Sequence, residues 1–73
     1  MSVAEQVGMN IRVVRTRKKM SQAALSEASG IERHHLSDIE LGKVNISLQT
    51  MTRLCSALGC DLADIVAGVK LDK

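Results

Sequence analysis

The positions of glycine, in a chain that contains no proline, constrain the fold more than any other feature of the sequence. Gly30, Gly42, Gly59 and Gly68 each follow a segment whose apolar residues recur every three or four positions. That spacing predicts amphipathic helices, and glycine most readily takes the left-handed conformation that ends a helix. The sequence therefore predicts a series of short helices without strands.

We expect five helices, and most of their starts carry a local signal. Ser2 and Glu5 form an S-x-x-E capping box ahead of a first helix that runs to about residue 19. The other helices are expected at about 22–29, 32–41, 48–58 and 62–66, with Ser21, Ile31, Ser47 and Asp61 in front of them. The expected inward-facing residues are Val3, Val7, Ile11, Val14, Ala24, Leu25, Ala28, Leu36, Ile39, Leu48, Met51, Leu54, Cys55 and Leu58. On the last helix, Leu62, Ile65 and Val66 share one side.

Length and composition narrow the class of protein. The 73 residues are expected to form a single small domain, 1–73, with a thin core. Because the chain has no Phe, Trp or Tyr, it offers no stacking platform for unpaired bases. No apolar run approaches the roughly 20 residues that span a bilayer, and residues 1–10 do not resemble a secretory signal. We expect a soluble cytoplasmic protein.

The two cysteines, Cys55 and Cys60, are too few for a disulfide scaffold or a zinc site. His34 and His35 are neighbours, so on a helix they point about 100° apart and do not chelate one ion. We expect two reduced structural thiols, no metal and no cofactor.

The net charge of +2 conceals a local excess of basic residues, five of which fall within eight positions without an acid: Arg12, Arg15, Arg17, Lys18 and Lys19. Such a run is typical of a solvated helix C-terminus, where cations are favoured. It is equally typical of a contact for nucleic-acid phosphates. Charge alone does not decide between the two.

Two charged residues fall on stripes that otherwise face inward. Arg15 lies four positions after Ile11, and Glu40 lies four positions after Leu36. An isolated buried charge is costly, and a guanidinium can bind both oxygens of a carboxylate. We expect Arg15 and Glu40 to form an ion pair between the first and third helices. The alternative is that each side chain reaches water separately.

The segments 21–26, 30–31 and 36–43, which read SQAALS, GI and LSDIELGK, resemble the Cro/cI-type (XRE-like) helix-turn-helix family. The segment 11–15 is similar to that family's first helix, and 45–48 and 58–59 to its fourth, so the resemblance covers about residues 7–66. It implies a compact five-helix, all-α, lambda-repressor-like bundle with a helix-turn-helix at about 21–42. The third helix would lie in the major groove of double-stranded DNA.

The resemblance also implies roles for particular residues. Candidates for base contacts are Arg33, His34, Ser37 and Asp38; candidates for backbone contacts are Gln22, Arg17, Lys18, Lys19, His35 and Lys43. Arg15 and Glu40 match an internal ion pair of the family. Glu32 departs from the Ser, Thr or Asn of many relatives and puts a negative charge at the edge of the expected interface. Without the family, His34 reads as an ordinary exposed histidine paired with Asp38.

A domain of this size buries little surface on DNA, so we expect a homodimer on a two-fold operator. The expected dimer segment is about 60–71, through Leu62, Ile65, Val66 and Val69. The alternative is that these four residues complete the core. We expect a transcriptional regulator, similar to controller proteins of restriction–modification systems or to prophage repressors, with RNA polymerase as a further candidate partner.

The sequence also contains features of two other function classes. His34, Ser37 and Asp38 contain the residue types of a hydrolase triad, but one exposed helical face lacks a pocket and an oxyanion hole, so we do not expect an enzyme. An antitoxin-like or protein-binding module would use the same bundle against a partner protein, and the sequence discriminates poorly against it.

Overall fold

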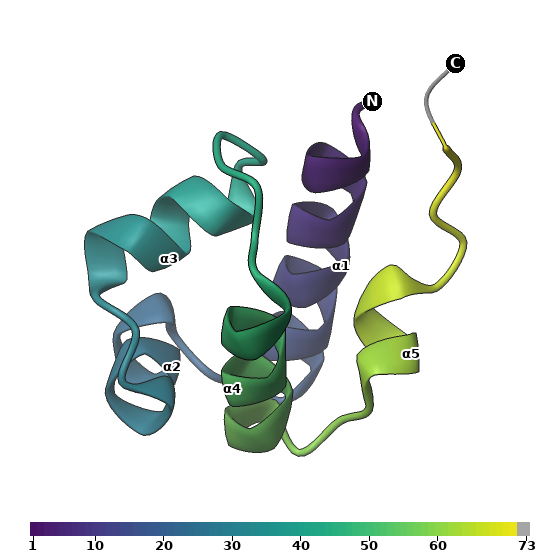
Figure 1. Ribbon diagram of the computed structural model, residues 1–73. Helices are drawn as coiled ribbons and strands as arrows, with labels where there is room; N and C mark the ends of the chain where they lie inside the picture. The colour runs from purple at the N-terminus through teal and green to yellow at the C-terminus, as the bar shows by residue number, and fades with distance from the viewer. Residues whose placement is uncertain (72–73) are drawn as a thin grey trace.

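The computed structural model describes residues 1–71, and over these residues the chain forms five α-helices and no strand (Figure 1). The helices are α1 (Val3–Arg17), α2 (Gln22–Ser29), α3 (Arg33–Glu40), α4 (Leu48–Leu58) and α5 (Leu62–Val66). The predicted all-helical fold is confirmed, and the predicted helix bounds agree within two residues. Positions 72–73 of the predicted domain lie outside the described residues.

Serine side chains begin three of the helices. The Ser2 hydroxyl accepts a hydrogen bond from the Glu5 N–H at 3.1 Å, while the Ser2 N–H donates to the Glu5 carboxylate at 2.9 Å. Ser21 and Ser47 cap α2 and α4 in the same way, each accepting from the N–H three residues on at 3.0 Å. These local bonds satisfy N–H groups that a helix start otherwise leaves unpaired, so the starts could be read from the sequence.

The helix ends follow the glycines, with one exception at the end of α1. Gly30, Gly42 and Gly59 have φ near +70°, the left-handed conformation that closes a helix. The residue in that position after α1 is Lys19, with φ 58°. The Met20 N–H donates to the Arg15 carbonyl at 3.1 Å there and completes the closing turn.

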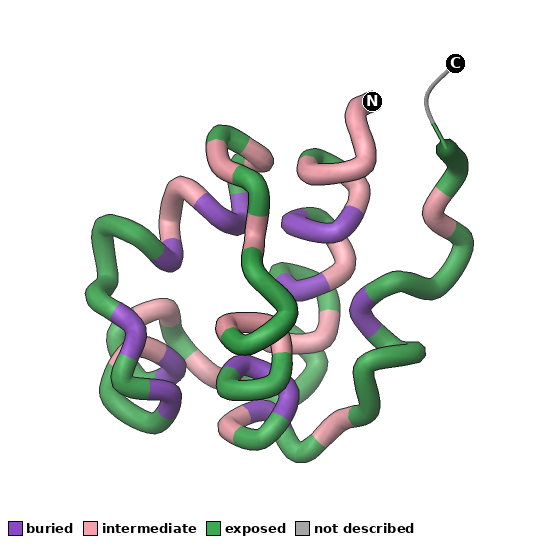
Figure 2. The backbone as a smooth tube through the Cα atoms, viewed as in Figure 1, coloured by how far each residue is buried: buried purple, intermediate pink, exposed green. Residues whose placement is uncertain are grey.

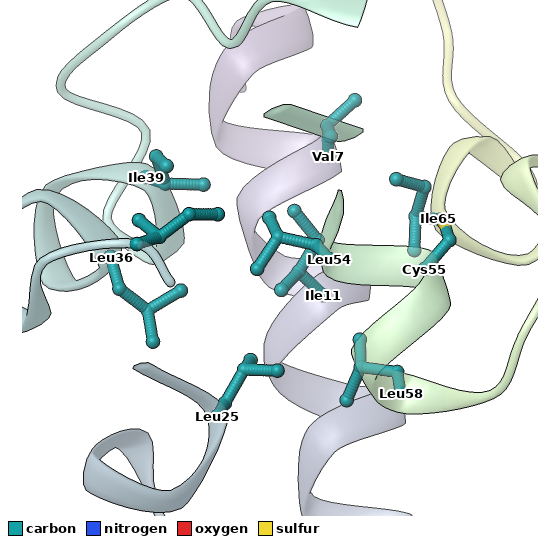
Figure 3. Packing of buried hydrophobic residues seen from close by; sticks show 10 residues of the cluster. Val7, Ile11, Leu25, Leu36, Ile39, Leu54, Cys55, Leu58 and Ile65 are labelled. Carbon is teal, nitrogen blue, oxygen red and sulfur yellow. The ribbon is translucent and has the colours of Figure 1, made fainter. Parts of the chain in front are cut away.

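The helices enclose one small core with α1 at its centre. α1 packs against α3 on one side and α5 on the other, while α2 packs against α3 and α4 (Figure 1). The buried apolar residues come from every helix and from the turn before α3 (Figures 2 and 3). They are Val7, Ile11, Leu25, Ile31, Leu36, Ile39, Leu54, Cys55, Leu58 and Ile65. Each is aliphatic or a thiol, so the buried cluster itself contributes apolar packing and no polar contact.

Some expected core residues are exposed. Ala24 and Ala28 face solvent, which leaves Leu25 as the apolar anchor of α2. Leu48 is 66% exposed because it is the first residue of α4 and projects beyond the core. On α5, Ile65 is fully buried whereas Leu62 and Val66 are 37% and 42% exposed. A helix of five residues presents one side chain to the core, not three.

α1 and α3 approach so closely that their contact depends on a glycine inside α1. Gly8 is buried, and a Cβ atom there would lie 2.7 Å from the Glu40 carbonyl oxygen and still closer to that of Ile39. A glycine within a helix costs about 1 kcal/mol relative to alanine, so its presence indicates a packing requirement. A glycine inside the first helix of the sequence is therefore a signal for this close contact.

The segment after α5 is tied back to α1 by two amide side chains. Gln6 donates to the Lys70 carbonyl at 2.8 Å and accepts from the Lys70 N–H at 2.7 Å. Asn10 donates to the carbonyls of Ile65 and Ala67, both at 3.0 Å. Within residues 1–71, no helix is long and apolar enough to cross a membrane.

Candidate nucleic-acid interface

α3 has one face in the core and one in solvent. Leu36, Ile39 and Glu40 are buried, while the three residues of its first turn, Arg33, His34 and His35, are exposed. Ser37 and Asp38 are half-buried along the border between the two faces. The outer face therefore carries the side chains that the sequence predicted for base contacts, and the chain's own residues leave its first turn uncovered (Figure 2).

Glu32 caps α3, and this explains the acidic residue at the start of that helix. Its two carboxylate oxygens accept hydrogen bonds from the N–H groups of His34 and His35, each at 3.0 Å. These bonds lower the pKa of the Glu32 carboxyl, and the bond from the His34 N–H has the larger effect. A helix N-terminus can bind a phosphate through its free N–H groups. In α3 the Glu32 carboxylate already occupies two of these N–H groups, so its negative charge faces its own helix.

The end of α3 positions one cation beside the outer face. Gly42 has φ 73°, and the Lys43 N–H donates to the Asp38 carbonyl at 2.9 Å, which closes the helix. The Lys43 side chain is exposed immediately after this turn, next to Leu41, which is also exposed. No hydrogen bond or ion pair joins His34 to Asp38 in the described part of the chain, so both remain available to a ligand.

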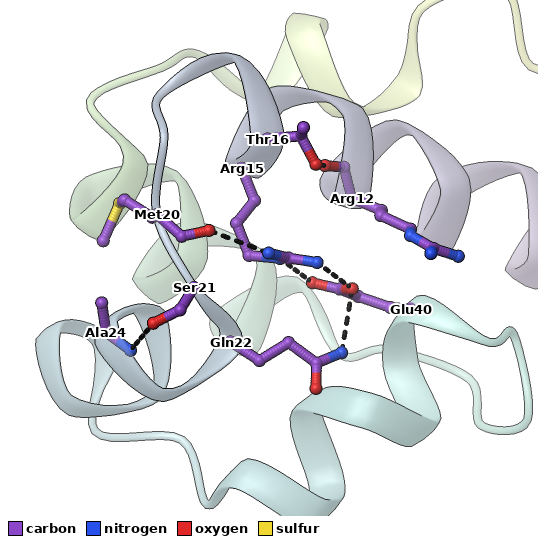
Figure 4. Close-up of polar contacts among 8 residues, drawn as sticks. All are labelled: Arg12, Arg15, Thr16, Met20, Ser21, Gln22, Ala24 and Glu40. Carbon is purple, nitrogen blue, oxygen red and sulfur yellow. Dashed lines mark hydrogen bonds and ion pairs between the residues drawn. The ribbon is translucent and has the colours of Figure 1, made fainter.

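The expected ion pair holds α3 from behind (Figure 4). Arg15 donates through Nε to Glu40 Oε2 at 2.7 Å and through Nη2 to Oε1 at 3.0 Å. Its remaining nitrogen, Nη1, donates to the Met20 carbonyl at 2.8 Å. The bidentate pair fixes the last turn of α3 to the end of α1 and to the turn that leads into α2.

Gln22, the candidate phosphate contact at the start of α2, belongs to the same network. Its Nε2 donates to Glu40 Oε1 at 3.1 Å (Figure 4). A side-chain amide carries two N–H groups, so one of them remains for a further acceptor. The network leaves no buried side-chain nitrogen or oxygen within residues 1–71 unpaired.

The remaining basic residues divide between two regions. Arg17 and Lys18 line a hollow with Gly59, Cys60 and Asp64, which places them at the junction of α4 and α5 and away from α3. Their predicted contact with the DNA backbone stays a prediction. One side of α1 meets α3. Arg17 and Lys18 lie on a different side of the helix, which packs against the junction of α4 and α5.

Arg12 lies on the α1 stripe that faces α3, between Gly8 and Arg15 at helical spacing, and it is exposed. Arg12 belongs to the basic run of the sequence and is not among the predicted contact residues. Its spacing from Arg15 was the signal that could have done so, because residues three apart on a helix are neighbours.

The predicted dimer residues differ in how far they are exposed. Ile65 is wholly within the core, so its assignment to a dimer surface is wrong: the short α5 needs it to reach α1 and α4. Val69 is half-buried and packs against the core. Leu62 and Val66 remain exposed on α5. No cluster of three potential metal ligands forms within residues 1–71.

Comparison with known proteins was consistent with this geometry. Residues 10–70 match the family model of the Cro/C1-type HTH DNA-binding domain. The chain is 36% identical over 67 residues to the immunity repressor protein of Bacillus phage phi105, and this match covers 92% of the chain and 46% of the repressor. It is 35% identical over 60 residues to the control protein C.BamHI of Bacillus amyloliquefaciens, covering 81% of the chain and 74% of that protein.

Solved structures give the same result. The restriction-modification controller protein C.AhdI from Aeromonas hydrophila superposes with a TM-score of 0.82 and 31% identity, covering 85% of this chain and 94% of that one. The clp gene regulator ClgR from C. glutamicum superposes with a TM-score of 0.87 and 30% identity, covering 90% of this chain and 86% of that one.

Proposed function

This chain belongs to the Cro/C1-type helix-turn-helix DNA-binding domain family, and from that premise we propose that it regulates transcription as a homodimer bound to a two-fold operator. The family and the relatives are DNA-binding regulators and not enzymes. The observation that carries the proposal is the two-sided α3, held from behind by Arg15 and Glu40 while its first turn stays open. We also propose that the protein acts in the cytoplasm. RNA polymerase is proposed as a further partner.

In the proposed complex the outer face of α3 reads bases in the major groove. Arg33 is the strongest reader, since a guanidinium binds O6 and N7 of guanine together. His34 and Ser37 each supply one hydrogen bond, and the Asp38 carboxylate accepts from a cytosine amine. Leu41 supplies an apolar contact for a thymine methyl group.

Phosphate contacts are proposed on both sides of that helix. Lys43 lies just after the end of α3, and Gln22 at the start of α2 has a second amide N–H that is free to bind a phosphate. Arg12 flanks the same face from α1, and His35 flanks it from the first turn of α3. Lys19, Arg17 and Lys18 add positive charge at longer range, where it speeds encounter with DNA more than it fixes position.

The second copy of the chain is proposed to dock on α5. Leu62 and Val66 are exposed side by side on it, one turn apart. Two copies related by a two-fold axis would place two α3 helices one turn of DNA apart, about 34 Å. Each half-site then adds contacts that a single small domain lacks.

Selection of bound duplexes from a random pool, at a stated salt concentration, tests this function. The expected result is an inverted repeat whose half-sites are about 10 base pairs apart, bound by two chains. Recovery of no shared sequence, or of a site without internal symmetry, would contradict the proposal.

The dimer surface has its own test. Leu62→Lys is expected to give a folded monomer by analytical ultracentrifugation, with loss of operator binding at concentrations where the parent chain is saturated. Leu48→Lys is the matched control, because Leu48 is also an exposed leucine but lies on α4. If both variants stay dimeric, α5 is not the interface.

A further inference from the structure

We propose that Cys55 and Cys60 form a reversible disulfide when the protein meets a peroxide, and that Cys60 is the thiol that the peroxide oxidises first. The proposal does not depend on DNA binding. It rests on the way in which α4 ends and on the different exposure of the two sulfur atoms.

The turn that closes α4 brings the two cysteines together. The Cys60 N–H donates to the Cys55 carbonyl at 3.0 Å, five residues back, while Gly59 between them has φ 69°. This hydrogen-bond pattern is the Schellman motif, which is frequently accompanied by a contact between the side chains of those two positions. Here Cys60 packs against the core cluster that contains Cys55. Both thiols are free in the structure. The backbone is therefore already folded into the short loop that a disulfide between them would close.

The two thiols differ in access. Cys55 is 5% exposed and belongs to the core, whereas Cys60 is half-buried and lines a hollow of about 340 Å³ together with Arg17 and Lys18. A hollow of that size admits a molecule as small as hydrogen peroxide. Burial and the hydrogen bond with Cys60 raise the pKa of Cys55 to about 11, which keeps its sulfur protonated and unreactive toward an oxidant from outside.

The chemistry proceeds in two balanced steps. The Cys60 thiol releases its proton and its sulfur attacks one oxygen of hydrogen peroxide. The O–O bond breaks, and the hydroxide that leaves takes up the released proton, so sulfenic acid and water form. The Cys55 sulfur then attacks the Cys60 sulfur, the S–O bond breaks, and hydroxide leaves with the Cys55 proton as water. In total, two thiols and one peroxide give one disulfide and two waters, and a dithiol reductant reverses the change.

The first step also favours the second. The hydrogen bond with Cys60 helps to hold the Cys55 proton in place. Conversion of Cys60 to a sulfenic acid alters that hydrogen bond and leaves an electrophilic sulfur next to the core residue Cys55. The buried thiol therefore becomes reactive toward its neighbour and not toward the solvent.

The test is stoichiometric hydrogen peroxide applied to the folded full chain at low concentration, followed by iodoacetamide under denaturing conditions and intact mass spectrometry. The expected result is a monomeric product that is two hydrogen atoms lighter, takes up no alkyl group, and regains both alkylation sites after dithiothreitol. Two alkyl groups before reduction, one cysteine oxidised beyond sulfenic acid with the other still free, or a disulfide between chains would each overturn the proposal.

Two variants assign the order of events. Cys55→Ala should stop at a Cys60 sulfenic acid that dimedone traps, while Cys60→Ser should leave Cys55 unmodified at the same peroxide dose. Trapping on Cys55 in the Cys60→Ser variant at the parent rate would overturn the assignment of Cys60. Because Cys55 is in the core, the folded state of its variant is checked by circular dichroism, and the Cys60→Ser result stands without it.

Discussion

Arg15 and Glu40, twenty-five positions apart, face each other with two guanidinium nitrogens on two carboxylate oxygens, at 2.7 and 3.0 Å. The Glu40 side chain is 3% exposed, so neither charge can be left alone without cost. The pair joins the centre of the fold to the back of the proposed recognition helix. Its loss should therefore affect stability first and DNA binding as a consequence.

Glu40→Ala is expected to lower the free energy of unfolding by about 3–5 kcal/mol, because it leaves the Arg15 guanidinium buried without its partner. Urea denaturation followed by circular dichroism measures the change. The double variant Arg15→Met/Glu40→Leu removes both charges and should regain most of the loss. A melting transition unchanged in Glu40→Ala would mean that the pair does not hold α3.

For Gly8→Ala, the sign of the change in stability shows whether α1 and α3 are in close contact at this position. Helix propensity alone would make alanine more stable than glycine by about 1 kcal/mol. The contact of Gly8 with the Ile39 and Glu40 carbonyls reverses this, and we expect a loss of about 1–3 kcal/mol from forced separation of α1 and α3. Thermal unfolding of the two proteins distinguishes the cases, and a gain in stability would refute the close contact.

Lys19→Gly is expected to stabilise the protein by about 0.5–1 kcal/mol, since Lys19 has φ 58° and glycine takes that conformation without a Cβ clash. Lys18→Gly is the matched control because it removes the same charge from a right-handed position, where glycine should destabilise by about 0.5–1 kcal/mol. Chemical denaturation gives both values. Equal effects of the two variants would contradict the assigned backbone conformation.

The acid side of the stability profile should depend on Glu5 and Glu32. Hydrogen bonds from the backbone N–H of Ser2, and from His34 and His35, lower the pKa of these carboxyls below the ordinary 4.5. A folded-state pKa below the unfolded value means that the contribution is complete above pH 4.5 and is lost as the pH falls through the lowered values. Glu32→Gln keeps the shape and removes that titration.

The free energy of unfolding of the parent chain and of Glu32→Gln should therefore be compared between pH 6 and pH 3. The expected difference is largest near pH 6 and narrows below pH 4.5. A difference that stays constant across this range would show that Glu32 does not act as a charged cap.

The sequence predicted the features that are set locally. The helix starts at Ser2, Ser21 and Ser47 depend on hydrogen bonds between residues three positions apart. The helix ends at glycines depend on the φ angle of one residue. The pairing of Arg15 with Glu40 was also predictable, since two helical stripes each carried one charge of opposite sign that could not be buried alone.

Features that depend on which helices touch were not predictable in this way. The role of Gly8 depends on the distance between α1 and α3, and Arg17 and Lys18 point where the junction of α4 and α5 happens to pack. Three apolar residues on α5 read alike in the sequence, yet packing buries Ile65 and exposes Leu62 and Val66. The left-handed Lys19 gave no signal because lysine is not the residue that such a position favours.

The most direct test of the central claim compares Arg33→Ala and Lys43→Ala on a selected operator and on random duplex, across a series of salt concentrations. Arg33→Ala should lose about 1–3 kcal/mol, roughly 5- to 150-fold, on the operator and little on random DNA. Lys43→Ala should weaken both alike and flatten the salt dependence by about one counterion. Equal losses on operator and random duplex for Arg33→Ala would contradict base reading by the outer face of α3.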